Sequence, residues 1–156
     1  MPAYELTARS RLHAPAERVW ARVSTMAGVN DELRPLFRMT HPAGVDRLDP
    51  PLGQLGKPAF RSWVLLFGLV PVDYDDIAIA RLDPGRGFLE RSRLGTQRLW
   101  EHERRIEPAG DACVLIDRVR HEPRLPIGER AQTALLRRVF LHRHRRLRRH
   151  FGGEPD

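Results

Sequence analysis

Three things are scarce in this 156-residue sequence: cysteine, lysine and long hydrophobic runs. The single cysteine, Cys113, excludes an intrachain disulfide and a cluster of thiolate metal ligands. The most apolar run, residues 63–72, is broken by Gly68 and Pro71 and is shorter than the roughly 20 residues that cross a bilayer. The first residues show no basic flank before an apolar stretch, so we expect no signal peptide. These absences predict a cytoplasmic protein without stable membrane insertion.

Charge is unevenly distributed along the chain. Lys and Arg together number 27 against 20 acidic residues, a formal net charge of +7, and Lys57 is the only lysine. Residues 129–156 hold eight arginines and three acids, so this segment alone carries +5. An arginine bias can follow from codon composition, and recognition aromatics and a second basic element are lacking. We therefore expect no nucleic-acid partner and interpret residues 137–149 as the solvated face of a helix; binding to nucleic acid or anionic lipid is the alternative.

Hydrophobic periodicity predicts a strand and two short helices at the beginning of the chain. Residues 4–12 alternate between apolar and polar side chains, as a half-buried strand does. Pro15 suits the first turn of a helix that Gly28 should end. Asn30 is a candidate cap for a second helix through about Phe37. Residues 40–57 contain three prolines and three glycines and should be irregular.

The rest of the chain predicts an antiparallel sheet closed by one long helix. Strands are expected at 60–67, 72–82, 88–94, 98–106 and 113–121. The helical pattern of residues 127–151 is long enough to cross the whole sheet, and 152–156 should be a frayed tail. The sequence thus predicts one α+β domain over residues 1–151, with a curved antiparallel sheet of about six to seven strands around a long C-terminal helix.

The last predicted hairpin carries a histidine and an acid on an apolar face. If Pro108–Asp111 forms the turn, Trp100 faces Val119 and His102 faces Asp117 across the two strands. The face they share also holds Ile106, Cys113 and Leu115, whereas the opposite face is charged. We therefore expect this face to be buried, with the histidine and the carboxylate as its polar centre.

Five motifs follow one another in order along nearly the whole chain. They are Leu12-x-Ala14-Pro15-x-Glu17-x-Val19-Trp20, then Leu82-Asp-Pro84-Gly-Arg86-Gly-Phe88, Trp100-x-His102, Leu115-x-Asp117-x-Val119 and Phe140-x-x-Arg143-His144-x-x-Leu147-x-x-x-Phe151. This ordered set resembles the SRPBCC superfamily, which includes START-type lipid-binding domains, birch-pollen-allergen-like proteins and polyketide cyclase/dehydrase-like proteins. It is similar to a bacterial branch described only as ligand-binding.

The resemblance implies a helix-grip fold with a cavity between the sheet and the last helix. Members of the superfamily bind lipids, sterols, polyketides or other apolar molecules, and a minority catalyse cyclisation or dehydration. Residues 53–71 depart from the usual pattern because their run Trp63-Val-Leu-Leu-Phe67-Gly is unusually apolar. That departure leaves the size and the entrance of the cavity open.

Three roles remain open for the pair of His102 and Asp117. The two side chains can satisfy each other in the core, hold a polar group of a ligand, or work as a proton-transferring pair. Arg104 shares their face and would either reach the sheet edge or hold a ligand carboxylate. The expected ligand-binding residues are Trp100, His102, Arg104, Leu115, Asp117, Val119, Phe140 and His144.

Other polar residues carry weaker expectations. Tyr74, Asp75 and Asp76 could serve a metal or acid–base site, but which face of their strand is buried stays open, and we interpret them as a solvated acidic patch. The facing of Glu90 and Ser92 is also unsettled. No element places three metal donors together, so we expect no metal, and nothing in the sequence calls for a cofactor.

The primary hypothesis is a non-catalytic domain that binds or carries a small, largely apolar molecule between the sheet and the last helix. The alternative is a cyclase, dehydratase or isomerase in which His102 transfers a proton with Asp117 behind it. A surface protein that uses its basic helix is the third. The sequence leaves the oligomeric state open, and a homo-oligomer is compatible with it.

Overall fold

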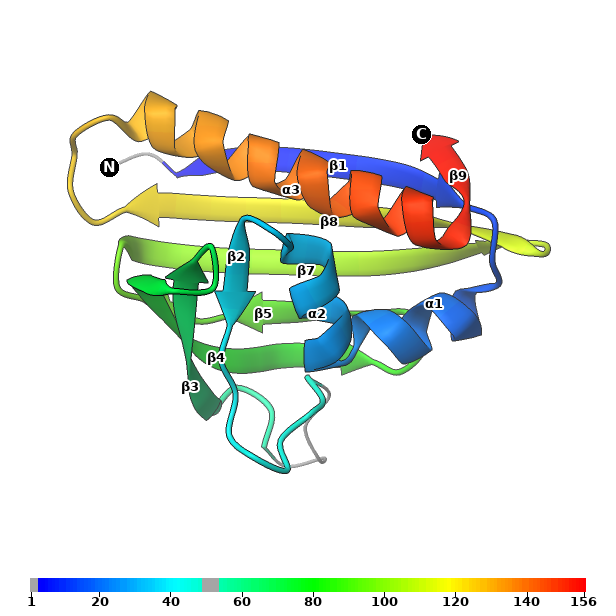
Figure 1. Cartoon of the computed structure of the whole chain (residues 1–156), viewed down its shortest axis with the longest axis horizontal. Helices are drawn as coiled ribbons and strands as arrows, with labels where there is room; N and C mark the ends of the chain where they lie inside the picture. The colour runs from blue at the N-terminus through cyan, green and yellow to red at the C-terminus, as the bar shows by residue number, and fades with distance from the viewer. Residues whose placement is uncertain (1–2, 49–53) are drawn as a thin grey trace.

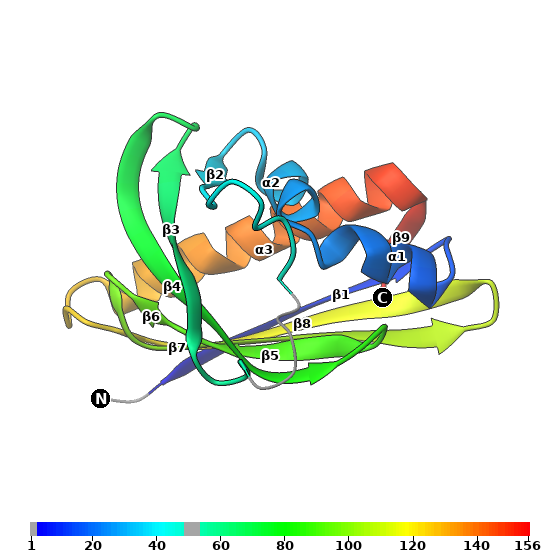
Figure 2. The same ribbon diagram turned by 90° about the horizontal axis from the view of Figure 1, so that it is seen from below.

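The computed structural model describes residues 3–48 and 54–156, which form one twisted antiparallel sheet with three helices on one side (Figures 1 and 2). The elements in chain order are β1 (Tyr4–Leu12), α1 (Ala16–Val23), α2 (Met26–Leu33), β2 (Phe37–Met39), β3 (Pro58–Leu66), β4 (Val70–Asp83), β5 (Gly87–Arg91), β6 (Arg93–Leu94), β7 (Gln97–Ala109), β8 (Ala112–Pro123), α3 (Glu129–Phe151) and β9 (Gly153–Pro155).

The strands lie in the order β2-β3-β4-β5-β7-β8-β1-β9, and β6 pairs with β4. The predicted α+β helix-grip class is confirmed, although nine strands are found where six to seven were expected. Residues 49–53 of the segment predicted to be irregular lie outside the described residues. None of the helices in the described ranges is long and apolar enough to cross a membrane.

Helix α3 runs along β1 and β8 (Figure 1), and its buried face is polar in the middle. Phe140 and Leu147 are buried at the ends of this face, and Arg143 and His144 are buried between them. Leu135, on the same helix, is 56% exposed and adds nothing to the buried face. The helix therefore covers the sheet with two apolar contacts that flank a polar one.

The β7–β8 hairpin has a tighter turn than predicted. The ladder continues to Ala109 and Ala112, so the turn is Gly110-Asp111, and Gly110 has a left-handed φ of 67° that suits glycine. The register consequently moves by two residues, and Asp117 faces Arg104 instead of His102. A shift of two keeps every side chain on its predicted face because side chains alternate with period two.

The second helix begins earlier than predicted. Thr25 caps α2 by accepting a hydrogen bond from the Gly28 backbone N–H at 3.0 Å, and the helix ends at Leu33. Gly28 does not end α1; it lies inside α2, where a β-carbon would stand 2.0 Å from the Arg22 carbonyl oxygen. Arg34 is extended because the residue before a proline disfavours helical geometry.

The C-terminal residues are not a frayed tail. β9 pairs with β1 through Leu12↔Gly153 and Ser10↔Pro155. Arg9 donates to Asp156 at 2.8 Å, and the His13 ring lies 2.8 Å from a Glu154 oxygen. The free edge of β1 supplies unpaired backbone groups, and the short tail satisfies some of them.

Candidate functional site

Asp117 is the centre of a buried polar cluster between the sheet and α3. Its Oδ1 accepts from Arg104 Nε and from His102 Nε2, both at 2.7 Å. Its Oδ2 accepts from an Arg104 terminal nitrogen at 2.7 Å and from His144 Nε2 at 2.8 Å. Because an ionised carboxylate has about four acceptor positions, Asp117 is saturated by protein donors.

Arg104 joins Asp117 to a second buried carboxylate. Its two terminal nitrogens donate to the two oxygens of Glu32 at 2.8 and 3.0 Å, and Arg143 Nε donates to Glu32 at 3.0 Å. The exposed fractions of Arg104, Asp117 and Glu32 are 0%, 0% and 1%. Strands β7 and β8 thus meet helices α2 and α3 through ion pairs in the core.

His144 is held by a hydrogen-bonded chain that reaches toward the surface. Its Nδ1 lies 2.8 Å from Ser10 Oγ on β1, and Arg148 donates to the same hydroxyl at 2.8 Å. With Nε2–H directed at Asp117, Nδ1 accepts from the serine. Both ring nitrogens are therefore engaged within the protein.

The cluster keeps its carboxylates ionised. Burial opposes ionisation of Asp117, but the charge and hydrogen bonds of Arg104, aided by His102, hold its pKa well below the usual range. Burial likewise opposes ionisation of Glu32, and Arg104 with Arg143 lowers its pKa. The charges compensate one another, as buried charges must.

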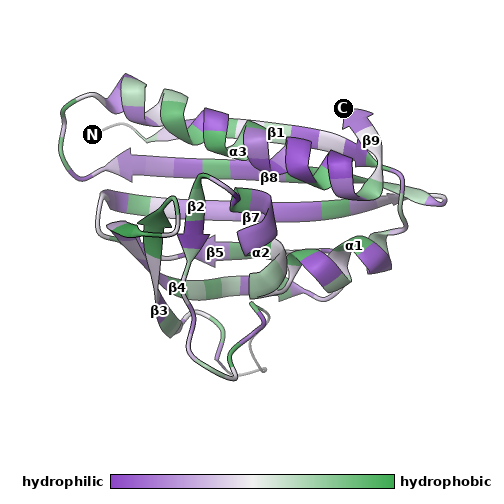
Figure 3. Ribbon diagram, viewed as in Figure 1, coloured by the Kyte–Doolittle hydropathy of each residue, from purple (hydrophilic) through white to green (hydrophobic). Residues whose placement is uncertain are grey.

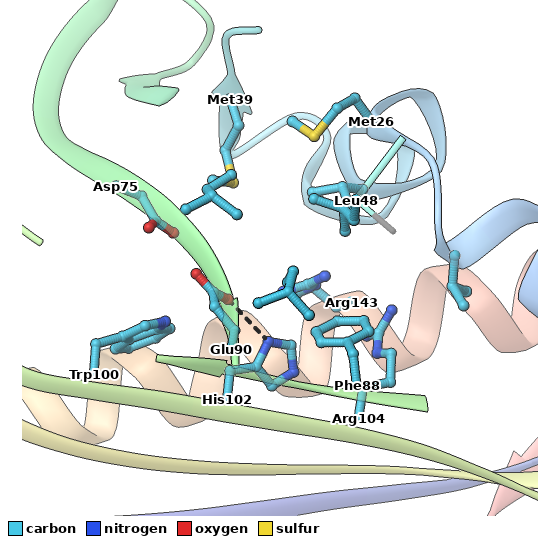
Figure 4. A pocket seen from close by; sticks show the side chains of 14 residues that line it. Met26, Met39, Leu48, Asp75, Phe88, Glu90, Trp100, His102, Arg104 and Arg143 are labelled. Carbon is cyan, nitrogen blue, oxygen red and sulfur yellow. Dashed lines mark ion pairs between the residues drawn. The ribbon is translucent and has the colours of Figure 1, made fainter. Parts of the chain in front are cut away.

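A cavity of about 70 Å3 lies beside this cluster, beneath α1 and α2 (Figure 4). It is bounded by the helices on one side and by β4, β5 and β7 on the other, and α3 contributes only Arg143. The expected position between the sheet and the last helix is filled by Phe140, His144 and Leu147. The lining residues are Val23, Met26, Val29, Met39, Leu48, Asp75, Ile77, Ile79, Phe88, Glu90, Trp100, His102, Arg104 and Arg143.

One wall of the cavity is acidic. Glu90 accepts from Ser92 Oγ at 2.6 Å, and its other oxygen lies 3.7 Å from His102 Nδ1. Burial, together with the neighbouring charge of Glu90, raises the pKa of Asp75 well above its ordinary value. Burial also opposes ionisation of Glu90, but the neighbouring His102, Asp75 and Ser92 side chains lower its pKa. The two pKa values are thus shifted in opposite directions, so Asp75 binds a proton more readily than Glu90.

Two polar atoms of this wall have no hydrogen-bond partner. They are Asp75 Oδ1 and Trp100 Nε1, and both residues line the cavity. Figure 4 shows Asp75 and Trp100 at one end of the cavity, with Met39 above them and with Met26 and Leu48 toward the other end. An unpaired buried polar group costs about 1–3 kcal/mol, so each atom favours a partner placed in the cavity.

The predicted site residues divide into two groups. Trp100, His102 and Arg104 line the cavity, while Leu115, Asp117, Val119 and His144 are buried outside its lining. Phe140 does not line it either, and its ring packs against that of His102 with centroids 5.0 Å apart. Arg104 has neither of the two roles considered for it: it does not reach the sheet edge, and its guanidinium binds two protein carboxylates, those of Glu32 and Asp117.

Sequence reasoning missed Asp75 and Glu32. Asp75 alternates with Ile77 and Ile79 on β4, and that parity was sufficient to place it on the buried face. The acid was instead grouped with its neighbours in a solvated patch. No local pattern marks Glu32 as buried, because its partners come from β7 and α3.

Comparison with known proteins places the chain in a family. The model of a family described as "Domain of unknown function (DUF8410)" matches residues 10–151. The chain belongs to this family. No curated protein matches it.

Solved structures share the fold of this DUF8410 domain. A START superfamily protein from Mycobacterium smegmatis is 13% identical over 94% of this chain and 96% of its own, with a TM-score of 0.67. An uncharacterized protein from Bacillus thuringiensis is 9% identical over 95% and 98%, with a TM-score of 0.68. The Zhui aromatase/cyclase from Streptomyces sp. R1128 is 13% identical over 94% and 92%, with a TM-score of 0.59. The START-like fold expected from the SRPBCC resemblance is confirmed.

The arrangement supplies polar recognition and an acid–base pair. Within the described residues, no group of three or more histidine, cysteine or acidic side chains is arranged to hold a metal ion. A ligand in the cavity would meet one donor, Trp100 Nε1, one acceptor, Asp75 Oδ1, and an apolar wall.

Proposed function

We propose that this chain binds a small molecule with an apolar body and a hydroxyl group, in the cavity beneath α1 and α2. The unpaired atoms Asp75 Oδ1 and Trp100 Nε1 carry the proposal. A hydroxyl both accepts and donates, so a single one can take the indole N–H and give its proton to the carboxyl oxygen. The START-like fold supports small-molecule binding in general terms.

The size of the cavity constrains the ligand. At about 70 Å3 the space is well below the roughly 300–1,000 Å3 of typical ligand pockets. Binding must therefore displace part of the wall. The polar side is fixed by the ion cluster around Arg104, whereas Met26 and Met39 are flexible side chains on the opposite side. We expect the apolar wall to move.

A pair of probes tests the hydroxyl. 4-Propylphenol and propylbenzene share an apolar body and differ by the hydroxyl alone. In a proton–nitrogen correlation spectrum, the chemical shift of the Trp100 indole N–H should change when 4-propylphenol is added. It should not change when propylbenzene is added. Two neutral hydrogen bonds of roughly 0.5–1.5 kcal/mol each imply that the phenol binds about fivefold to a hundredfold more tightly than the hydrocarbon.

Trp100→Phe should remove most of the preference for the phenol, while Trp63→Phe on the exposed hairpin should not. Equal affinity for the two probes would contradict the proposal. It would indicate that water, and not a ligand hydroxyl, forms the hydrogen bonds with Asp75 Oδ1 and Trp100 Nε1. Native mass spectrometry of the freshly purified protein, followed by solvent extraction, would then identify the natural ligand class.

Acid–base catalysis in the same cavity is the second candidate function, in keeping with the START-like fold of the Zhui aromatase/cyclase. The pKa of Asp75 is raised and that of Glu90 is lowered, so Asp75 would serve as the acid and Glu90 as the base, and neighbouring groups whose pKa values are shifted apart are typical of proton-transfer sites. His102 lies next to Glu90 and would relay a proton. Under this hypothesis Asp75→Asn abolishes turnover of a bound substrate while binding persists; loss of binding without any detectable turnover would favour a carrier.

A further inference from the structure

The outer end of the β3–β4 hairpin is apolar and exposed. Phe67 is 65% exposed, Leu69 81% and Val70 55%, and Trp63 and Val72 are 43% and 44% exposed. Between residues 60 and 72 the only charge is Arg61. The hydropathy colouring shows this end as hydrophobic (Figure 3). Contiguous exposed apolar side chains of this kind mark an interaction site.

The turn presents its aromatic side chain in an unfavourable conformation. Phe67 has a φ of 53°, which lies in the left-handed region of the backbone. Glycine and asparagine adopt this region readily, whereas a bulky residue rarely does. The turn is fixed because Phe67 N–H donates to Leu36 O at 2.8 Å and Leu69 N–H donates to Leu66 O at 3.0 Å. Local folding thus gives no reason for phenylalanine at this position, whereas an external contact does.

Two exposed arginines lie next to the hairpin end, and two more lie on the neighbouring part of α3. Arg34 and Arg38 are exposed, and a β-carbon built on Gly68 would lie 4.0 Å from that of Arg38. His142 of α3 donates to the Arg34 carbonyl at 2.7 Å, and Arg138 and Arg145 are exposed one turn to either side of it. Within residues 3–48 and 54–156 these four arginine side chains form no ion pair with an acid.

We propose that this surface, the tip Phe67–Val72 with Arg34, Arg38, Arg138 and Arg145, docks on an anionic phospholipid membrane. The hairpin rises on the side of the sheet that carries the helices (Figure 2), and the elements that bear the arginines, which are the end of α2, β2 and α3, lie on that side as well. Apolar side chains would enter the membrane interface to a depth of about 5–10 Å, and the guanidinium groups would meet lipid phosphates.

The charges favour this occupant over others. A second copy seated on the same surface would bring the two sets of arginines together, which like-charge repulsion opposes. Nucleic acid could stack on Phe67, but it would leave the aliphatic side chains of Leu69 and Val70 exposed, whereas a membrane interface buries all three. This surface shares no residue with the lining of the cavity, so membrane binding and ligand binding can be tested separately.

Vesicle co-sedimentation tests the surface. The protein should bind vesicles of phosphatidylcholine with phosphatidylglycerol at low salt, bind phosphatidylcholine alone weakly, and lose binding at high salt. The double variant Phe67→Asn, Leu69→Ser should lower the partition coefficient by about tenfold to a hundredfold. Asparagine suits the left-handed φ of residue 67, so the urea midpoint should not fall.

Two further variants complete the test. Leu125→Ser replaces a side chain that is 67% exposed in the connection before α3 and should leave binding unchanged. Arg34→Gln with Arg38→Gln should weaken binding to anionic vesicles several-fold for each arginine. Absence of binding to anionic vesicles, or full binding by the hairpin variant, would overturn the proposal. So would a wild-type dimer that this variant converts to monomer, since the surface would then be a self-interface.

Discussion

Removing the Arg104 guanidinium should destabilise the protein strongly. Arg104→Met keeps much of the side-chain volume but leaves Asp117 and Glu32 without their shared cation in a region that excludes water. Breaking a buried pair by removing one partner costs about 3–5 kcal/mol. For a domain of this size that corresponds to a fall in Tm of roughly 6–20 °C. Urea unfolding followed by far-ultraviolet circular dichroism measures the loss.

Arg61→Met is the matched control. Arg61 also binds a carboxylate through two nitrogens, at 2.7 and 3.0 Å from Asp76, but its side chain is 49% exposed. Water and salt screen such a pair, so its loss should change the urea midpoint little. The contrast between the two variants isolates burial, because the charge change and the substitution are identical.

The pH dependence of Arg104→Met gives a second, independent readout. In the wild type, the lowered pKa values of Asp117 and Glu32 contribute stability that is present above about pH 4 and lost as the pH falls through the folded values. Without Arg104 the negative charges of Asp117 and Glu32 are buried with fewer neighbouring positive charges, so protonation of these carboxylates stabilises the folded variant. The difference in unfolding free energy between wild type and variant should therefore shrink from pH 7 toward pH 4. A deficit no larger than that of Arg61→Met, or one that grows with acid, would refute the reasoning.

Two further predictions concern Asp75 and the C-terminus. Asp75→Asn removes a group whose folded pKa is raised; this group stabilises the wild type at low pH, and the contribution is lost as the pH rises through that pKa. Urea midpoints between pH 4 and about pH 9 should accordingly fall less steeply in the variant, and an unchanged slope would contradict the protonation of Asp75. Deleting residues 153–156 removes β9 and the Arg9–Asp156 pair, so we expect a loss of about 1–2 kcal/mol and faster amide exchange in β1; no change would show that the strand pairing contributes nothing.

The sequence predicted the faces of the strands better than their pairing. Trp100, His102 and Arg104 point inward as expected, because alternation alone decides the face. The pairing partner of each was wrong by two residues, since turn length is a local choice that alternation does not determine. His102 and Asp117 still meet because diagonal neighbours on one face remain within reach of long side chains.

The interior was harder to predict than the sheet. Glu32 and Arg143 come from separate helices, and glutamate and arginine are ordinarily exposed to solvent unless they are paired. Their burial follows from ion pairing with Arg104, which is a tertiary contact. The exposure of Phe67 was equally hidden, because an apolar run ordinarily predicts a core strand.

The ion cluster decides where a ligand can go in this fold. Asp117, Arg104 and His144 occupy the space between the sheet and α3 and have their hydrogen-bonding capacity used by one another, so that space offers little to a ligand. The same cluster holds His102 through Nε2 and leaves Nδ1 to the cavity wall with Glu90. A rigid polar wall thus faces a flexible apolar one across a small space. A hydroxyl of the ligand would form hydrogen bonds with Asp75 and Trp100 on the polar wall. The apolar body of the ligand would be accommodated by movement of Met26 and Met39 on the apolar wall.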